Sequence, residues 1–248
     1  MSLTFTIITP CFNSAKTIEH TIRSVREQSY SLVEHVCIDG GSTDGTLEIL
    51  QRTGVRHISG PDAGIYDAMN KGLSLATGDV VGILNSDDYY ADADVLSTVA
   101  AAFERDKLDL LHGKVRQIDD AGAMVCEVGR NATPRQMLRR MVAAHPSVFI
   151  RRALYQRFGG FSVGFRIAGD YEHLLRLWPK VKRGFLDQVV VEMRVGGASH
   201  TSPAASYRES AAAAVLHGRN PFLAALDCLE GLARNYVVQA LRARRRRA

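Results

Sequence analysis

Hydrophobic residues in the first 90 positions alternate between short continuous runs and segments in which they recur at helical spacing. Four runs predict strands, at residues 5–9, 33–39, 55–59 and 80–84. Three intervening segments predict helices, at residues 17–28, from 45 through 50, and 65–76. Regular alternation of strands and helices is typical of βαβ units and a parallel sheet. Because the strands are almost wholly apolar, we expect both faces of this sheet to be buried.

The second half is less regular but continues the same α/β pattern. Helices are predicted at residues 94–106, 134–141, 153–158 and 170–178. Strands are predicted at residues 108–112, 115–118 (as part of a hairpin), 147–150 and 189–193. Residues 196–203 are rich in glycine and serine and predict a loop. The expected fold class is α/β, with a Rossmann-like, mostly parallel sheet flanked by helices.

A final helix is expected from Pro221, since Asn220 suits the cap and proline suits the first turn. Its apolar residues form one stripe, Phe222, Leu226, Leu229, Ala233, Tyr236, Val237 and Ala240. We therefore divide the chain into a main domain at 1–219 and an amphipathic helix with a basic tail at 220–248. Within the main domain, the regular half is residues 1–90 and the less regular half is residues 91–219.

Composition narrows the class of protein. The chain is 46% hydrophobic, and it contains no run of about 18 uncharged apolar residues, so no membrane-spanning helix is predicted. Its first residues lack the basic and apolar regions of a signal peptide. Its four cysteines are widely separated, which argues against a zinc cage or a disulfide framework. These features predict a cytoplasmic protein.

The net charge of +5 is equalled by five arginines at positions 242 and 244–247, so the rest of the chain is neutral. A neutral body argues against a nucleic-acid partner, which would need a concentrated basic face. Together with the apolar stripe, the arginines suit peripheral contact with the anionic inner face of a membrane. The alternative is a helix packed on the body with a solvated tail, and the sequence leaves both open.

Polar residues follow the strand at 80–84, where the sequence reads Asn85-Ser86-Asp87-Asp88. In open α/β sheets, ligands bind at the carboxyl ends of the strands. Oxygen donors at such a point suit a hard divalent cation that shares its coordination shell with phosphates. The alternative is a loop in which Asp87 or Asp88 caps the next helix.

Four motifs together resemble those of family 2 glycosyltransferases, which are inverting enzymes with the GT-A fold. In chain order they are TPCFN at 9–13, DGGSTDGT at 39–46, DAGIYDAMNKG at 62–72 and NSDD at 85–88. The GIYDAMNKG segment is similar to the branch that makes colanic acid and mycobacterial glycolipids. The resemblance is close over about the first 90 residues and looser to about residue 200. It implies transfer of a sugar from a nucleoside diphosphate donor.

The resemblance also implies that residues 1–90 form a nucleotide-binding half, with a nucleotide site, and that residues 91–219 form the acceptor-side half. The expected residues of the nucleotide site are Pro10, Phe12, Asp39, Asp62, Asn70 and Ser86. Asp39 would contact the uracil imide, while Pro10 and Phe12 would line the base pocket. Asp39 could instead be satisfied by the backbone of its own turn, and for Asp62 a turn role is also open.

The family's metal motif is represented by Asn85, Ser86 and Asp87, with an amide where the family has its first acid. The resemblance makes Asp87 the principal ligand of Mg²⁺ or Mn²⁺, with Asn85 and His200 as further candidates. A cation is expected because a departing diphosphate develops negative charge. The amide at 85 puts the affinity and the preferred ion in doubt.

A general base must deprotonate the acceptor hydroxyl. The segment AGDYEHLLR at 168–176 resembles a late motif of the family, which makes Asp170 the candidate base and Glu172 the second choice. A helix N-cap is the alternative for Asp170. His145 resembles a substrate-side element of the same branch, and a buried core histidine is the alternative.

The sequence thus predicts an inverting glycosyltransferase acting on a glycan or lipid-linked acceptor, at the cytoplasmic face of a membrane or in the cytoplasm. Two rivals remain, a sugar-nucleotide nucleotidyltransferase and a catalytically silent sugar-nucleotide-binding protein. A dinucleotide dehydrogenase is disfavoured, because no GxGxxG motif follows the first strand. The sugar and the acceptor are not identified by the residues.

Overall fold

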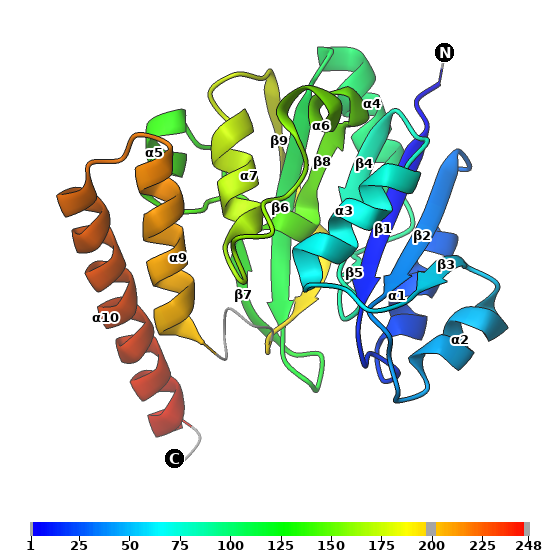
Figure 1. The fold of residues 1–248 in the computed structure, drawn as a ribbon, viewed down its shortest axis with the longest axis horizontal. Helices are drawn as coiled ribbons and strands as arrows, with labels where there is room; N and C mark the ends of the chain where they lie inside the picture. The colour runs from blue at the N-terminus through cyan, green and yellow to red at the C-terminus, as the bar shows by residue number, and fades with distance from the viewer. Residues whose placement is uncertain (1, 197–201, 246–248) are drawn as a thin grey trace.

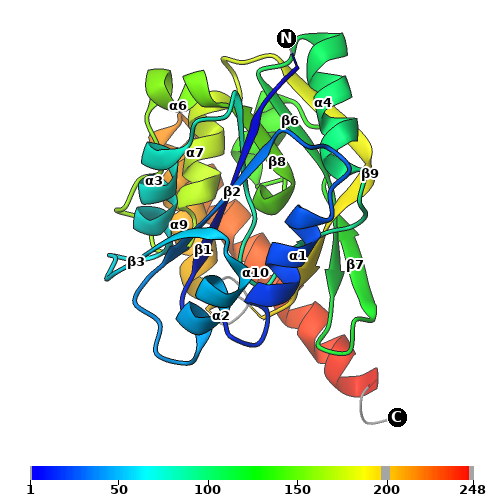
Figure 2. The same ribbon diagram turned by 90° about the vertical axis from the view of Figure 1, so that its right-hand side faces the viewer.

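The computed structural model describes residues 2–196 and 202–245, with side chains up to residue 237. Over these residues, one nine-stranded sheet separates two layers of helices (Figure 1). Turned by 90°, the molecule shows α3 (Ile65–Leu75), α6 (Arg152–Phe158) and α7 (Gly169–Leu177) on one face of the sheet. Helices α1 (Ile18–Arg26) and α4 (Val95–Asp106) cover the other face (Figure 2). The predicted α/β class is confirmed.

The first half is the predicted series of βαβ units. Its strands are β1 (Phe5–Cys11), β2 (Val33–Asp39), β3 (Arg56–Ser59) and β4 (Val80–Ile83). They lie in the order β3-β2-β1-β4, all parallel, with Phe5 opposite both Val33 and Val80. Helix α2 (Thr46–Thr53) connects β2 to β3. The reversal of order between β1 and β4 creates the switch point at which such sheets bind ligands.

The second half makes the sheet mixed. Strand β8 (Val148–Arg151) is antiparallel to both β4 and β6 (Leu110–Ile118). Strand β6 also pairs with β7 (Met124–Val128) in a hairpin. Strand β9 (Arg183–Arg194) is parallel to β6 and antiparallel to the short β5 (Tyr89–Tyr90). The two strands predicted at 108–112 and 115–118 are therefore one, because Gly113 is accommodated where β6 and β9 shift register.

Strand β9 begins earlier than the predicted 189–193. Its first residues include Asp187 and Gln188, which are exposed and dilute the apolar signal. Pairing with β6 supplies the hydrogen bonds that extend the strand.

The second half of the chain contains several further helices. Besides α6 and α7, they are α5 (Pro134–Arg139), the short 3₁₀ helix η1 (His145–Ser147), α9 (Pro203–Leu216) and α10 (Pro221–Arg245). The sequence did not predict α9, whose alanine-rich segment lacks one clear apolar face. Ala213 and Ala214 nevertheless bury completely in the core. Helix α10 begins at the predicted Pro221, whereas residues 197–201 of the predicted loop lie outside the described residues.

Alternate side chains of β1 point into two different parts of the core. Ile8 belongs to the same buried cluster as Tyr66 of α3 and Tyr171 of α7, while Phe5 and Ile7 belong to a second cluster that includes Phe103 of α4. Both faces of the central strands are buried, as their continuous apolar runs predicted. This packing fixes the carboxyl ends of β1 and β4 relative to the amino-terminal end of α7.

Gly78, just before β4, tests this packing. A Cβ atom there would lie 2.6 Å from the backbone carbonyl carbon of Phe5 and 2.6 Å from the amide nitrogen of Thr6. Since backbone atoms of a central strand cannot move aside cheaply, we expect Gly78→Ala to lower the free energy of unfolding by about 2 kcal/mol. Urea denaturation measures the change. Gly60→Ala is the matched control, because nothing lies within 4 Å of the added carbon there, and an equal loss in both variants would contradict the prediction.

Candidate functional site

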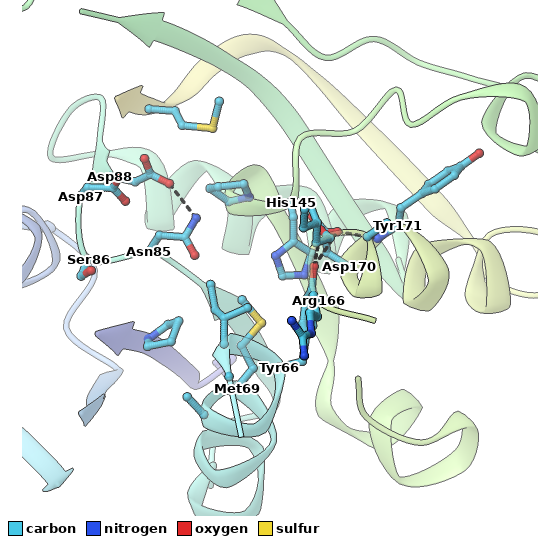
Figure 3. Close-up of a pocket in the computed structure, with 18 of the residues that line it drawn as sticks. Tyr66, Met69, Asn85, Ser86, Asp87, Asp88, His145, Arg166, Asp170 and Tyr171 are labelled. Carbon is cyan, nitrogen blue, oxygen red and sulfur yellow. Dashed lines mark hydrogen bonds between the residues drawn. The ribbon is translucent and has the colours of Figure 1, made fainter. Parts of the chain in front are cut away.

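A cavity of about 600 Å³ opens at the carboxyl ends of β1 and β4. It collects most of the predicted site residues, namely Pro10, Phe12, Asp62, Asn85, Ser86, Asp87, His145 and Asp170. Figure 3 shows the group from the end of β4 on one side of this cavity and Asp170 with His145 on the other. Residues far apart in the sequence are thus brought to one cavity by the sheet order.

The loop after β4 carries an unusual set of buried oxygens. The Asn85 side-chain amide donates to Asp88 Oδ2 over 3.0 Å. The side-chain oxygen of Asn85, Oδ1, and the second carboxylate oxygen of Asp88, Oδ1, are both buried without a hydrogen-bond partner. Burial raises the pKa of Asp87, and burial together with the Asp87 charge raises the pKa of Asp88 well above its usual range. Unpartnered buried acceptors are costly, so these two oxygens lack a donor, and the Arg194 charge only partly offsets the effect of burial on the two aspartates.

Such a set fits a hard divalent cation. Asn85, Asp87 and Asp88 all line the cavity and offer amide and carboxylate oxygens, which Mg²⁺ and Mn²⁺ prefer. Within the described part of the chain, no group of three or more His, Cys, Asp or Glu side chains could hold an ion. A cation bound here would complete its shell with oxygens from a ligand, the arrangement usual at phosphate-binding sites.

Asp170 lies in the first turn of α7 and faces the cavity. Its Oδ1 accepts from the Tyr171 amide over 2.8 Å and lies 3.2 Å from the Tyr66 hydroxyl. The same hydroxyl donates to Ile167 O over 2.6 Å. Gly169 makes this approach feasible, because a Cβ there would lie 2.7 Å from the Tyr66 ring. Tyr66 of α3 therefore holds both the Asp170 carboxylate and the loop before it.

A second side chain holds that loop from the opposite direction. Glu209 on α9 accepts from the backbone amides of Arg166, Ile167 and Ala168, at 3.1, 2.8 and 3.0 Å to Oε2. Helix α7 has no side-chain cap from its own N-cap residue. A carboxylate at a helix amino terminus is favourable both for the free amides and for the helix dipole. Glu209 thus acts as a remote cap that fixes the turn carrying Asp170.

His145 lines the cavity as an uncharged side chain. It is buried, and its ring meets Phe161 edge-on with ring centroids 5.3 Å apart. Burial lowers the pKa of His145, although the nearby Asp170 charge acts in the opposite direction. At neutral pH the imidazole is therefore neutral and can donate or accept a hydrogen bond in the cavity. Arg166 and Arg194 also line the cavity and supply positive charge.

Three of the predicted residues do not line the cavity. Asp39 is buried at the end of β2, where its carboxylate accepts from Gly41 and Ser42 of its own turn and from the Ser59 hydroxyl over 2.6 Å. This is the turn alternative raised by the sequence, and the contact of Asp39 with a base stays a prediction.

Asn70 uses its amide on the backbone of Phe161, donating to its carbonyl and accepting from its N–H, both over 2.8 Å. Glu172 is buried, forms an ion pair with Arg176 at 2.6 Å and makes a hydrogen-bond contact with the His217 ring at 3.0 Å. Asp170 is therefore the carboxylate of that turn that faces the cavity. His200 lies outside the described residues.

Four residues that belong to the site were not among the candidates, Tyr66, Asp88, Arg166 and Glu209. Tyr66 and Asp88 lie inside the motifs at 62–72 and 85–88, so their position in the sequence could have identified them as site candidates. Arg166 and Glu209 had no sequence signal, because the loop and helix that carry them meet only in the folded chain.

Comparison with known proteins supports a common architecture. One similar solved structure is TarS of S. aureus in complex with UDP-GlcNAc, with a TM-score of 0.70 and 21% sequence identity; the match covers 95% of this chain and 73% of that chain. Another is the mannosyltransferase PcManGT of Pyrobaculum calidifontis in complex with GDP-Man and Mn²⁺, with a TM-score of 0.69 and 19% identity; the match covers 98% of this chain and 80% of that chain. The fold and its cavity at the strand ends define the GT-A class.

Sequence comparison identifies the family. The profile described as glycosyl transferase family 2 matches residues 6–144. An uncharacterized glycosyltransferase of Mycobacterium tuberculosis is 32% identical over 88% of this chain and 86% of its own length. A PGL/p-HBAD biosynthesis glycosyltransferase of Mycobacterium bovis is 32% identical over 79% of each chain. The chain belongs to glycosyl transferase family 2, as its motifs predicted.

The role of Glu209 is testable without substrate. Glu209→Ala removes the acceptor of three backbone amides, so we expect the amides of 166–168 to exchange hydrogen markedly faster. Because charge-assisted hydrogen bonds are lost, the free energy of unfolding should fall by about 2 kcal/mol. Hydrogen exchange and urea denaturation measure the two effects. Glu209→Gln keeps an acceptor oxygen and should recover part of the protection, and unchanged exchange in Glu209→Ala would contradict the assignment.

Proposed function

We propose that the protein is an inverting glycosyltransferase that moves a sugar from a nucleoside diphosphate sugar, of the UDP type, to a hydroxyl of a glycan or lipid-linked acceptor. The observation that carries this proposal is that Asp87 and Asp170 line one cavity. TarS, a structural relative, binds UDP-GlcNAc, and a sequence relative belongs to glycolipid biosynthesis by its name. Acceptors of this kind place the reaction at the cytoplasmic face of a membrane.

The donor occupies the side of the cavity formed by β1 and β4. Phe12 leaves 62% of its surface exposed at the cavity, so its ring is available for stacking with a base. Pro10, Asp62 and Ser86 line the same side. Asp62 accepts from the Gly64 amide through Oδ1 over 2.9 Å, which leaves its other oxygen for a ligand.

Asp87, with the Asn85 side-chain oxygen, would hold a divalent cation at the donor side of the cavity. When bound, Mg²⁺ or Mn²⁺ neutralises the charge that develops on the departing diphosphate. The unpartnered oxygens of Asn85 and Asp88 support this role. The amide at position 85 supplies an oxygen without adding a third negative charge to a loop that already buries two carboxylates.

Asp170 acts as the general base on the opposite side of the cavity. It takes the proton of the acceptor hydroxyl while that oxygen bonds to the anomeric carbon in line with the leaving diphosphate. The bond between the anomeric carbon and the diphosphate oxygen breaks, its electron pair leaves with the diphosphate, and the configuration inverts. Tyr66 and Glu209 hold the Asp170 turn in place, and His145 contributes a neutral polar group beside it.

Asp170→Asn tests the base. We expect transfer to fall about 100-fold or more, while donor binding is retained because Asp170 acts on the acceptor side. Transfer is measured with the nucleotide sugar that gives the largest thermal shift in a donor screen with Mn²⁺. Asp120→Asn, which removes an exposed carboxylate outside the cavity, is the control and should keep full activity. Near-normal transfer by a folded Asp170→Asn variant would refute the assignment.

Metal removal tests the Asp87 site. A chelator should abolish transfer, and Mn²⁺ or Mg²⁺ should restore it. Asp87→Asn should abolish the Mn²⁺-dependent part of the donor-induced thermal shift, because the principal ligand of the cation is lost. Chelator-resistant transfer would remove the cation from the mechanism. Release of pyrophosphate from a nucleoside triphosphate would instead identify a nucleotidyltransferase.

A further inference from the structure

Helix α10 is the outermost element beyond α9, at the end of the molecule opposite β3 (Figure 1). One side of it packs on the body. Ala224 is buried, and Gly231 lies against the Tyr207 ring of α9, where a Cβ would come within 2.3 Å. Asp227 forms ion pairs with Arg139 and Arg219 at 3.2 and 2.6 Å. This side is therefore fixed to the rest of the structure.

The opposite side of α10 is apolar and exposed. We call it the outer face, and it consists of Phe222, Leu226, Leu229, Tyr236 and Val237. Their exposed fractions are 71, 46, 62, 76 and 55%. The helix packs on the body through its other side, and the apolar stripe seen in the sequence stays exposed. A run of exposed apolar side chains along one helix marks an interaction site.

Exposed arginines gather near α10. Arg130, Arg140 and Arg234 are exposed. The pKa of Arg140 is lowered by partial burial and by the neighbouring charges of Arg234, Arg130 and Arg139. The acidic residues of this part of α10, Asp227 and Glu230, are already paired with arginines. The sequence adds five more arginines at 242 and 244–247.

This combination matches one kind of partner. None of the described helices is long and apolar enough to cross a membrane. A helix with an apolar face and flanking arginines lies in the headgroup region of a bilayer, and it is attracted by anionic lipids. A second copy of the chain suits the face less well, since a symmetric contact would bring two equally basic surfaces together.

We propose that the outer face of α10 docks on an anionic lipid bilayer, with its apolar side chains among the acyl chains and its arginines at the lipid phosphates. Docking has a consequence for the cavity, and this part rests on the proposed function. Helix α9 lies between the cavity and α10. Its Ser206 and Ser210 line the cavity, and its Tyr207 ring packs against Gly231 of α10. A lipid-linked acceptor in the same bilayer is thereby held one helix away from Asp170.

Co-sedimentation of the full chain with vesicles tests the docking. We expect binding to phosphatidylglycerol-containing vesicles that weakens with added salt, and much weaker binding to phosphatidylcholine vesicles. Phe222→Ser combined with Leu229→Ser should weaken binding roughly tenfold or more, since two apolar anchors are lost. Replacing Arg242, Arg244 and Arg245 with glutamine should also weaken it and reduce the salt dependence.

The matched control is Ile58→Ser combined with Met124→Ser, which removes two apolar side chains that are 48 and 64% exposed elsewhere. This variant should bind vesicles like the natural sequence. Equal vesicle binding by the α10 variant and the control would overturn the proposal. So would a concentration-dependent dimer that only the α10 variant loses, without vesicle binding. Donor turnover with a soluble acceptor is measured separately, so a failure of docking is distinguishable from a failure of the proposed transfer.

Discussion

The cost of burying negative charge at the end of β4 constrains the whole site. Asp87 and Asp88 are adjacent, and burial raises the pKa of both. Asn85 satisfies one oxygen of Asp88 and leaves two neighbouring acceptor oxygens without partners. A charged group removed from water needs a compensating partner. We propose that a cation completes the loop, which would couple the stability of the loop to ligand binding.

On the other side of the cavity, the Asp170 carboxylate is held in a defined place while it stays open to the cavity. Asp170 accepts a hydrogen bond from the Tyr171 amide, and its Oδ1 lies 3.2 Å from the Tyr66 hydroxyl. The rigidity comes from the turn beneath it, which Tyr66 holds through Ile167 O and Glu209 through three backbone amides. Supporting groups on α3 and α9 thus fix the position of a carboxylate that faces the cavity. Helix α9 also carries α10, so the surface proposed for lipid contact and the proposed base share one support.

Much of the candidate site was predictable because its residues sit in short motifs at strand ends. Pro10, Phe12, Asn85, Ser86 and Asp87 follow β1 and β4, and a parallel sheet brings these ends to one edge. Asp39 and Asn70 stood in motifs of the same quality, yet their side chains satisfy the local backbone. Motif spacing could not separate these cases, since the direction of a side chain depends on what packs around it. Glu172 was similarly plausible, but in the folded chain its carboxylate pairs with Arg176 and contacts the His217 ring.

The sequence by itself determined the parallel βαβ half, the membership of a glycosyltransferase family and the chemistry of the strand-end loop, because these depend on local periodicity and on residues close together in the chain. Only the tertiary structure decided the mixed second half of the sheet and the existence of α9. It alone brought Glu209 to the 166–168 amides, and it alone showed that the apolar stripe of α10 faces outward. The physical reason is that these features depend on contacts between segments distant in sequence. A local sequence pattern does not indicate the free energy of such contacts.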